Sequence, residues 1–548
     1  MSKKIVIIGG VAAGASAAAR LRRLDEEADI LMFERGQDIS FANCGLPYYV
    51  GGVIAKKNRL LVQTPRAMAR RFAIDVRVLT EVQEIIPAEK RVVAHDLGSG
   101  EMYSENYDYL ILCPGAQPIV PDIPGINRPN VYTVRNIPDS EKIKAHVEES
   151  GVRNVVILGA GFIGMEMAEM MQLRGLNVTV VEAGSQILGI LDPEMAHLAE
   201  KYVASEGVKF IKGDIPVELA GDPAVDKVIL QSGAEIPADL VILGIGVRPE
   251  TWLAEQAGLK LGETGGILVD EYLRTSDPFI FAAGDAIQVK DYVTGQDTLI
   301  PMAGPANRQG WVVANNIAGR SIAYPGSQGT GIIKLMDLVV ATTGRNEKAL
   351  QRLDVKYLTC HAHPNSHATY YPGSSQMTVK LIFSSPEGRI LGAQVVGFEN
   401  VDKTIDALAT AIRAKMTVYD LQDLELAYAP PFSSAKTPVN LVGYVAGNIL
   451  DGMVDTVSWE EVEARVEQGS LLVDVRTEDE NKKMPVQGAV NLPLDDLRSN
   501  LDQLREDQEI LAFCQVGLRS YVANRILRQK GFKVKNISGG YKLYPKGE

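Results

Sequence analysis

Cysteine is scarce in this chain, and its scarcity excludes several kinds of protein. The 548 residues include four cysteines, Cys44, Cys113, Cys360 and Cys514, and no two of them share a short spacing. Disulfide scaffolds and zinc knuckles both need cysteines at short spacings, so neither is indicated. We therefore expect a reducing compartment, in which each cysteine is either reactive or inert on its own.

Two further features are missing. A membrane helix needs about 20 consecutive apolar residues, and no run approaches that length. Positive charge is not in excess: 56 basic residues face 68 acidic ones, and the net charge of −12 argues against a general nucleic-acid surface. Lys3 and Lys4 precede an apolar stretch as in a signal peptide, but Gly9, Gly10 and Gly14 break that stretch. We expect a cytoplasmic protein that binds neither membrane nor nucleic acid.

The chain carries one short pattern twice. Residues 4–8 form an apolar run that leads into the turn GGVAAG, an alanine-rich helix and a second run ending at Glu34. Residues 153–158 begin the second copy, which has the turn GAGFIG and ends at Glu182. Such a turn places a pyrophosphate at a helix N-terminus, and the terminal acid binds ribose hydroxyls. The pattern predicts two dinucleotide sites, with contacts at Gly9, Gly10, Val11, Ala12, Ala13, Gly14, Glu34, Gly159, Gly161, Phe162, Ile163, Gly164 and Glu182.

A third segment indicates which dinucleotide each of the two sites binds. Residues 275–285, TSDPFIFAAGD, resemble the second flavin motif of two-dinucleotide flavoprotein reductases, and residues 107–118 resemble the strand and turn by which those enzymes leave the FAD domain. The resemblance implies FAD at the first site, a nicotinamide at the second, and Cys113 as packing. It also implies further cofactor contacts at Arg35, Asn43, Val82, Pro114, Gly115, Gly246, Gly284, Asp285 and Ala303. The Glu182 carboxylate would repel a 2′-phosphate by up to about 4 kcal/mol, which favours NADH over NADPH.

The segment SFANCGLPYYVGG, residues 40–52, contains one cysteine where many flavin disulfide reductases have a C-x-x-x-x-C pair. Cys44 therefore needs a partner from outside: a mixed disulfide with a small thiol, a persulfide, or a sulfenic acid. A free thiol with a pKa of about 8.5 is only about 3% ionised at pH 7, so we expect the site to lower the pKa of Cys44.

This segment closely resembles that of coenzyme A disulfide reductase and its relatives, the single-cysteine NADH oxidases and peroxidases, and the likeness extends through residues 1–446. It implies substrate contacts at Ser16, Arg20, Arg23, Ser40, Asn43, Arg71, Asn307 and Lys436. Arg20 and Arg23 are three residues apart on one helix face, as a grip on coenzyme A phosphates requires. A solvated helix end explains the same two charges without a ligand.

Residues 326–446 resemble the dimerisation domain of that family. The resemblance implies a homodimer with shared active sites, in which Tyr370 and Tyr428 reach the partner's cysteine and act in catalysis. Tyrosines in such loops are otherwise ordinary interface anchors. Cys360 and three nearby histidines (His361, His363 and His367) suggest a metal, but Pro364 breaks the helix that would align them, so we expect no metal site.

The C-terminal residues resemble a single rhodanese domain. Its active loop would be Cys514-Gln-Val-Gly-Leu-Arg519, in which Cys514 and Arg519 are catalytic. Four intervening residues close a cradle of backbone amides at a helix N-terminus, which stabilises a thiolate or a bound persulfide. Tyrosine phosphatases have five intervening residues, so the shorter loop favours sulfur transfer. An inactive rhodanese-like binding domain is the alternative.

Together these features predict an α/β protein with two nested Rossmann-like domains, an α+β dimerisation domain and a rhodanese α/β domain. The predicted ranges are FAD domain 1–112 and 241–325, NADH domain 113–240, dimerisation domain 326–446, linker 447–458 and rhodanese domain 459–548. The predicted activity is NADH- and FAD-dependent reduction of coenzyme A persulfide or polysulfide with release of hydrogen sulfide. Three alternatives stay open: coenzyme A disulfide reductase, NADH oxidase through a Cys44 sulfenic acid, and a sulfur carrier with a redox-sensing flavin half.

Overall fold

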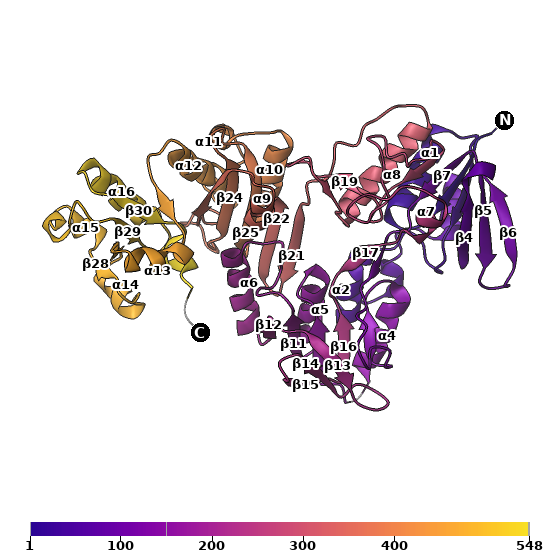
Figure 1. The fold of residues 1–548 in the computed structure, drawn as a ribbon, viewed down its shortest axis with the longest axis horizontal. Helices are drawn as coiled ribbons and strands as arrows, with labels where there is room; N and C mark the ends of the chain where they lie inside the picture. The colour runs from indigo at the N-terminus through magenta and orange to yellow at the C-terminus, as the bar shows by residue number, and fades with distance from the viewer. Residues whose placement is uncertain (1, 150, 546–548) are drawn as a thin grey trace. The chain divides into compact units, whose positions relative to one another are not determined.

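The computed structural model describes residues 2–149 and 151–545. The chain forms two compact units, Met1–Ile187 with Ala204–Gly329, and Leu188–Val203 with Thr330–Glu548 (Figure 1). No helix among the described residues is long and apolar enough to cross a membrane.

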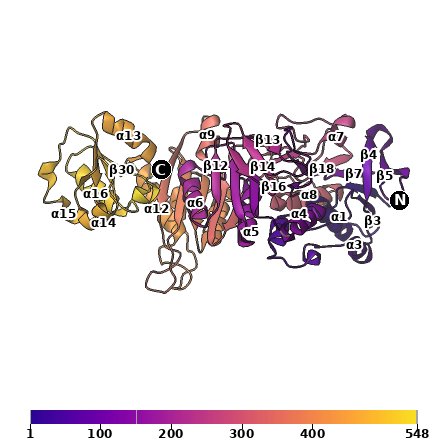
Figure 2. The same ribbon diagram turned by 90° about the horizontal axis from the view of Figure 1, so that it is seen from below.

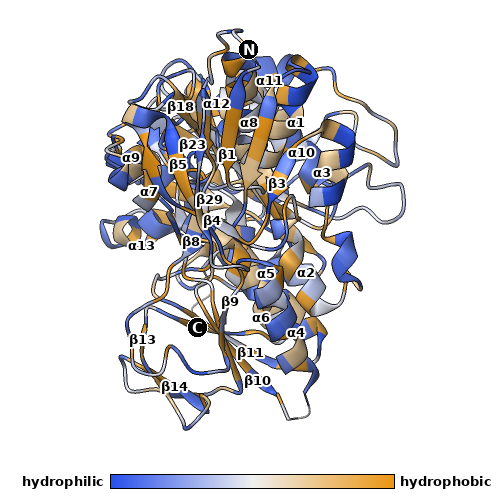
Figure 3. Cartoon of the chain, turned by 90° about the vertical axis from the view of Figure 1, so that its right-hand side faces the viewer, coloured by the Kyte–Doolittle hydropathy of each residue, from blue (hydrophilic) through white to orange (hydrophobic). Residues whose placement is uncertain are grey.

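The first sheet of the first unit is parallel and almost entirely buried. The apolar run at the N-terminus forms its central strand, and a strand from beyond the second nucleotide segment completes one edge. The strand order is β18 (Ile280–Ala282), β7 (Tyr109–Leu112), β1 (Lys4–Ile8), β2 (Asp29–Phe33) and β3 (Asp75–Arg77). Figure 3 shows β1 as a hydrophobic strand, as expected for a strand covered on both faces. Helix α1 (Ala12–Leu24) packs against α8 (Ala303–Ile317).

The second nucleotide segment repeats this architecture. Its parallel sheet has the order β12 (Lys209–Lys212), β11 (Asn177–Glu182), β10 (Asn154–Leu158), β16 (Leu240–Leu243) and β9 (Val131–Thr133). Helix α5 (Phe162–Leu173) follows β10 as α1 follows β1. The helices α2 (Leu46–Gly51) and α4 (Ile137–Glu148) lie beside each other in the same unit. These observations confirm the two nested Rossmann-like folds.

Antiparallel strands complete the first unit. One three-stranded sheet contains β4 (Thr80–Ile86), β5 (Arg91–Asp96) and β6 (Met102–Asn106), and another contains β13 (Pro216–Ala220), β14 (Lys227–Leu230) and β15 (Glu235–Pro237). Strand β8 (Ala116–Pro118) pairs with β17 (Val247–Pro249) where the chain crosses between the two nucleotide folds.

The second unit begins with an antiparallel sheet. Its order is β21 (Gly331–Leu335), β22 (Leu338–Gly344), β25 (Ile390–Gly397), β24 (Thr378–Ser384) and β23 (Tyr357–Ala362). The helices α10 (Val401–Arg413), α11 (Val418–Asp423) and α12 (Pro438–Leu450) accompany it. This unit also includes residues 188–203, most of α6 (Pro193–Ser205), which follow the second nucleotide fold in sequence.

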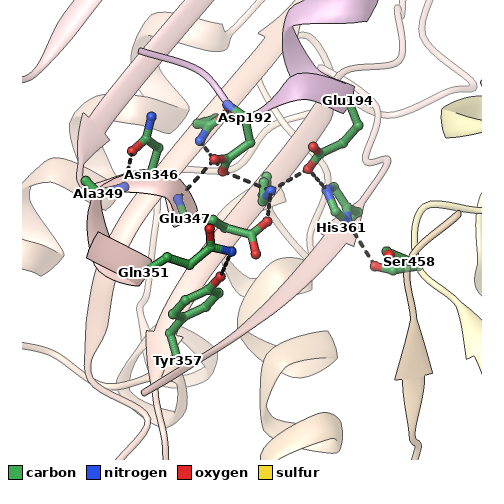
Figure 4. Close-up of polar contacts among 12 residues, drawn as sticks. Asp192, Glu194, Asn346, Glu347, Ala349, Gln351, Tyr357, His361 and Ser458 are labelled. Atoms are coloured by element: carbon green, nitrogen blue, oxygen red, sulfur yellow. Dashed lines mark hydrogen bonds and ion pairs between the residues drawn. The ribbon is translucent and has the colours of Figure 1, made fainter. Parts of the chain in front are cut away.

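A buried ion cluster fixes that segment. The fully buried ammonium of Lys380 lies 2.9 Å from Asp192 and also contacts Glu194 and Glu347. His361 adds a 2.9 Å contact to Glu194. Figure 4 shows the three carboxylates converging on one point. One ammonium thus balances carboxylates from α6 and from α9 (Glu347–Arg352), an arrangement that sequence patterns did not predict.

The C-terminal domain is a parallel sheet with helices on both faces. The order is β26 (Thr456–Val457), β30 (Val534–Ile537), β29 (Ile510–Phe513), β27 (Leu471–Asp474) and β28 (Val490–Asn491). Alternate residues of these strands face α13 (Trp459–Glu467) and α16 (Leu518–Gln529), which lie on opposite sides in Figure 2. The smaller helices are α14 (Glu478–Lys483) and α15 (Leu494–Leu497). Because α12 continues to Leu450 and β26 joins the sheet, the irregular connection spans 451–455, less than the expected 447–458.

Candidate active site

The two glycine turns have the same backbone geometry. Gly9 has φ +97° and Gly159 has φ +101°, values that favour glycine. A Cβ atom on Gly14 would lie 1.9 Å from the Gly9 carbonyl oxygen, and one on Gly164 would lie 2.0 Å from that of Gly159. Each helix therefore begins in close contact with its turn, the arrangement that presents a helix N-terminus to a pyrophosphate.

The acids predicted to bind ribose occupy matching positions. Glu34 accepts hydrogen bonds from the amides of Gly10 at 2.9 Å and Gly36 at 2.8 Å. Glu182 accepts equivalent bonds from the amides of Ala160 and Gly184, both at 2.8 Å. Both carboxylates therefore lie against their glycine turns, one at the end of β11 and the other one residue beyond β2.

Two adjoining pockets extend from the first turn, and they share Gly9, Glu34, Arg35 and Pro114. One continues to Val82 and Trp252. The other brings together segments far apart in sequence, and its lining includes Val11, Ala12, Ala13, Asn43, Cys113, Gly115, Gly284 and Asp285. Gly10 and Gly14 belong to the turn itself, and Ala303 begins α8, which contributes Ala306 to the lining. The Asp38 Oδ2 atom, buried at this pocket, has no hydrogen-bond partner among the described residues.

The pockets fit FAD. Together the two pockets form a trough that passes a helix N-terminus and the Glu34 carboxylate, as a dinucleotide requires, and the unpaired Asp38 oxygen is a further acceptor for it. Arg35 stands at the trough and pairs with Glu250 at 3.0 Å.

Cys44 lies in a short 3₁₀ turn, Asn43–Gly45, directly before α2. Its side chain is exposed and its thiol is free. Partial desolvation, then the nearby carboxylates of Glu166 and Asp285, raise the pKa of Cys44 above its usual range. The expectation of a lowered pKa is therefore wrong for the chain by itself, because the backbone amide that favours the thiolate is outweighed.

Glu166 is a neighbour of Cys44 that the sequence analysis missed. It lies on α5, and Tyr48 on α2 donates a hydrogen bond of 3.3 Å to its Oε1. Burial, and the charge of Glu169, raise the pKa of Glu166 to about 7, although the Tyr48 bond acts in the opposite direction. The position of Glu166 two residues after Gly164 marks it as helical, but nothing in the pattern indicates that it faces the cysteine turn.

The residues on α1 that are predicted to hold coenzyme A contact two different helices, α8 and α3 (Pro65–Phe72). The Ser16 hydroxyl donates to Asn307 on α8, and Arg20 donates to Asn315 at 3.2 Å on the same helix. Arg23 instead lies over the ring of Phe72, 5.2 Å from its centre, and Arg71 is exposed on α3 (Pro65–Phe72). Ser40 donates its amide to the Gly10 carbonyl at 2.8 Å, beside Asn43. Arg20 and Arg23 thus contact different elements in the structure.

In the second unit, Tyr370 and Tyr428 are close together and exposed. Their hydroxyl oxygens are 2.9 Å apart, and this hydrogen bond raises the pKa of Tyr370. The Lys436 ammonium lies 4.8 Å from the centre of the Tyr444 ring. Whether these groups reach a partner's cysteine stays a prediction.

The histidines near Cys360 have partners within the protein. His363 is hydrogen-bonded to Thr378 and to the Gly539 carbonyl, both at 3.0 Å, and burial lowers the pKa of His363 to about 3. His361 bonds Ser538 at 2.8 Å. Two histidines from β23 and the loop after it therefore hold the 538–539 turn of the C-terminal domain.

That turn supports the Cys514 loop. Cys514 is fully buried at the end of β29, with the Gly517 amide 3.2 Å and the Ser520 hydroxyl 3.6 Å from its sulfur. The Tyr541 amide donates to the Cys514 carbonyl at 2.7 Å. Arg519 makes two hydrogen bonds, of 2.6 and 2.7 Å, to Glu480 on α14. Glu480 was missed, because Thr477 and Glu480 form a capping pattern that indicates only where a helix begins.

Comparison with known proteins agrees with this arrangement. The model of the pyridine nucleotide-disulphide oxidoreductase family matches residues 3–310, that of its dimerisation domain 331–439, and that of the rhodanese-like domain 458–546. This family uses FAD and NAD(P)H.

Individual relatives cover the whole chain or most of it. The structure of reduced Bacillus anthracis CoADR-RHD is 51% identical, with a TM-score of 0.98 over 99% of this chain and 98% of that one. An NAD-dependent persulfide reductase from A. fulgidus is 38% identical, with a TM-score of 0.93 over 99% of this chain and 100% of that one. The NAD(P)H sulfur oxidoreductase (CoA-dependent) of Pyrococcus furiosus is 38% identical over 81% of this chain and 99% of that protein. The chain belongs to the pyridine nucleotide-disulphide oxidoreductase family.

Proposed function

We propose that this enzyme uses NADH and FAD to reduce coenzyme A persulfide or polysulfide, releasing hydrogen sulfide, and that its rhodanese domain carries sulfur on Cys514. The observation that carries the proposal is that Cys44, a solitary and exposed cysteine, directly follows Asn43, which lines the trough proposed for the flavin. The other cysteine of this unit, Cys113, is an unsuitable resolving thiol because burial raises its pKa to about 12. A solitary cysteine must exchange with a diffusing sulfur compound.

Each residue set has a proposed role. The turns at residues 9–14 and 159–164 hold the two dinucleotides, with Glu34 and Glu182 on their riboses. Glu182 favours NADH because a 2′-phosphate would meet its negative charge. Bound FAD would supply the two-electron step that connects NADH to sulfur. The proposed substrate contacts are those predicted above: Ser16, Arg20 and Arg23 on α1, Ser40 and Asn43 at the cysteine turn, Arg71 on α3, Asn307 on α8, and Lys436.

The proposed reaction begins with a Cys44 thiolate that attacks the coenzyme A sulfur of the persulfide. The sulfur–sulfur bond breaks, hydrosulfide leaves, and Cys44 forms a mixed disulfide with coenzyme A. Two electrons that originate from NADH then restore the Cys44 thiolate and release coenzyme A thiol. One NADH and one proton are consumed for each hydrogen sulfide. Tyr370 and Tyr428 of a second subunit would donate a hydrogen bond to the leaving thiolate, which requires a homodimer with shared sites.

The second candidate is coenzyme A disulfide reduction, which uses the same residues with a different leaving group. Relatives named coenzyme A disulfide reductase in Staphylococcus aureus are 33% and 34% identical over 81% of this chain. The built sulfur site at Cys514 favours the persulfide, because a disulfide substrate supplies no sulfane sulfur for it.

Anaerobic NADH oxidation by the full-length flavoenzyme tests the proposal. We expect kcat/KM to be higher with coenzyme A persulfide than with coenzyme A disulfide, and hydrogen sulfide to form in step with NADH loss. A higher value with the disulfide would support the second candidate. NADH loss that requires oxygen and ignores both substrates would support an oxidase.

A further inference from the structure

The cation of the Cys514 loop is already paired. Both terminal nitrogens of Arg519 donate to the two oxygens of Glu480, at 2.6 and 2.7 Å, and each side chain is about one-third exposed (33% and 32%). Such a two-point contact is the strongest form of arginine–carboxylate pair. The Arg519 guanidinium in turn holds the pKa of Glu480 down at about 2, so the carboxylate is charged at any physiological pH.

Two other cations of this domain are also paired. Arg476, which packs on Phe513 and Tyr541 beneath the loop, is fully buried and bonded to Asp474 at 2.7 Å. On α14, Lys482 pairs with Glu478 at 3.0 Å. The Cys514 sulfur faces two neutral donors, the Gly517 amide and the Ser520 hydroxyl, and also interacts with the Arg519 guanidinium, whose charge Glu480 already pairs.

This charge balance matters because sulfur donors differ in the group they leave behind. When Cys514 takes the outer sulfur of an alkyl persulfide, the donor's sulfur–sulfur bond breaks, a Cys514–sulfur bond forms, and an alkyl thiolate with one negative charge departs. The same transfer from thiosulfate expels sulfite, which carries two negative charges. Neither transfer needs an external oxidant or reductant. A dianionic leaving group needs a free cation nearby, whereas a thiolate needs much less.

We propose that Glu480 sets the donor specificity of Cys514 by neutralising Arg519, so that the loop accepts sulfur from alkyl persulfides in preference to thiosulfate. This rests on the proposed sulfur-carrying role of Cys514 and specifies its donor class. Glu480 is a specificity residue that acts through Arg519.

The test measures sulfur loading of Cys514 in the full-length flavoenzyme with Cys44→Ser, which removes the exposed Cys44 thiol. The donors are thiosulfate and the persulfide of 2-mercaptoethanol, and the readout is the rate at which the Cys514 peptide gains one sulfur by mass spectrometry. Glu480→Gln keeps the capping pattern with Thr477, because glutamine serves at that position, but removes the charge. Glu478→Gln, on the same turn of α14, is the matched control, and Cys514→Ser gives the background.

We expect the parent protein to load faster from the persulfide. Glu480→Gln should raise the thiosulfate rate about tenfold and change the persulfide rate by less than about threefold, whereas Glu478→Gln should change neither. Glu480→Ala should move the ratio in the same direction, which guards against a local folding defect in one variant. An unchanged donor ratio in both Glu480 variants, or faster loading from thiosulfate in the parent, would overturn the proposal and leave the carrier role intact. Loading from neither donor in any variant would remove the carrier role and the proposal with it.

Discussion

Cys44 and Cys514 are both free thiols in turns that lead into a helix, yet the chain surrounds them in opposite ways. Cys44 is exposed, and the carboxylates of Glu166 and Asp285 oppose its ionisation. Cys514 is buried, and the Gly517 amide and Ser520 hydroxyl point at its sulfur. The chain thus provides anion stabilisation at Cys514 itself, whereas Cys44 depends on what binds next to it.

The two cysteines should differ most in what happens to persulfide reduction when each sulfur is removed. Cys44→Ser should lower NADH-dependent persulfide reduction by about 1000-fold or more, because the nucleophile is lost. Cys514→Ser should leave the reduction of small persulfides unchanged, since its sulfur serves transfer from other donors. Anaerobic NADH oxidation with coenzyme A persulfide checks both variants. Substantial activity in Cys44→Ser would mean that the flavin half only senses redox state.

The second unit, which contains Cys514, also contains the buried ammonium of Lys380, and no equivalent buried ammonium is described near Cys44. Lys380→Met should destabilise the protein by about 3–5 kcal/mol, because the buried Asp192 and the partly buried Glu194 and Glu347 lose their ammonium. Thermal unfolding monitored by circular dichroism measures the change. Glu347→Gln is the matched control: it removes one of three negative charges that face a single lysine, so we expect a much smaller loss of stability. Equal losses in the two variants would contradict a charge-balancing role for Lys380.

The Cys514 loop should also be sensitive to its backbone support. Gly540 has φ +59°, and a Cβ atom there would lie 2.5 Å from the Cys514 carbonyl oxygen and 2.9 Å from the Gly517 nitrogen. Gly540→Ala should therefore slow sulfur loading of Cys514 by about 10- to 100-fold, because a shift of the loop misaligns its amides. Gly531→Ala, at φ +92° in open space, is the control for backbone strain alone. Similar effects of both variants would show that the Gly540 contact is irrelevant to the loop.

The same contrast explains which parts could be predicted from sequence. Some features are local patterns, because a few consecutive residues determine each of them. These are the glycine turns, the acids at the ends of β2 and β11, and the loop from Cys514 to Arg519. The pairing of Glu480 on α14 with Arg519 on α16, separated by 39 residues, depends on the tertiary arrangement that brings the two side chains together. Glu166 faces the Cys44 turn only because α2 packs on α5, and Lys380 meets Asp192 only because residues 188–203 leave their sequence neighbours. Such neighbours follow from tertiary packing, which no local pattern encodes.

The smallest expected effect concerns the proton on Cys44. Because the pKa of Glu166 is about 7, this carboxyl is mostly neutral below pH 6 and mostly charged above pH 8, where it opposes the thiolate. Glu166→Gln should therefore shift the pH profile of Cys44 alkylation by iodoacetamide to lower pH. The shift should be less than about one unit, since desolvation, the larger cause, remains in the variant.

Below pH 6 the alkylation rates of the parent and Glu166→Gln should coincide, because glutamine then resembles a protonated glutamate. Tyr48→Phe removes the hydrogen bond that favours the charged form of Glu166, so in this variant the Glu166 carboxylate should form only at higher pH than in the parent. Glu255→Gln, an exposed carboxyl that does not act on Cys44, should leave the profile unchanged. Identical profiles for the parent and Glu166→Gln would mean that the Glu166 carboxylate does not act on the Cys44 thiol.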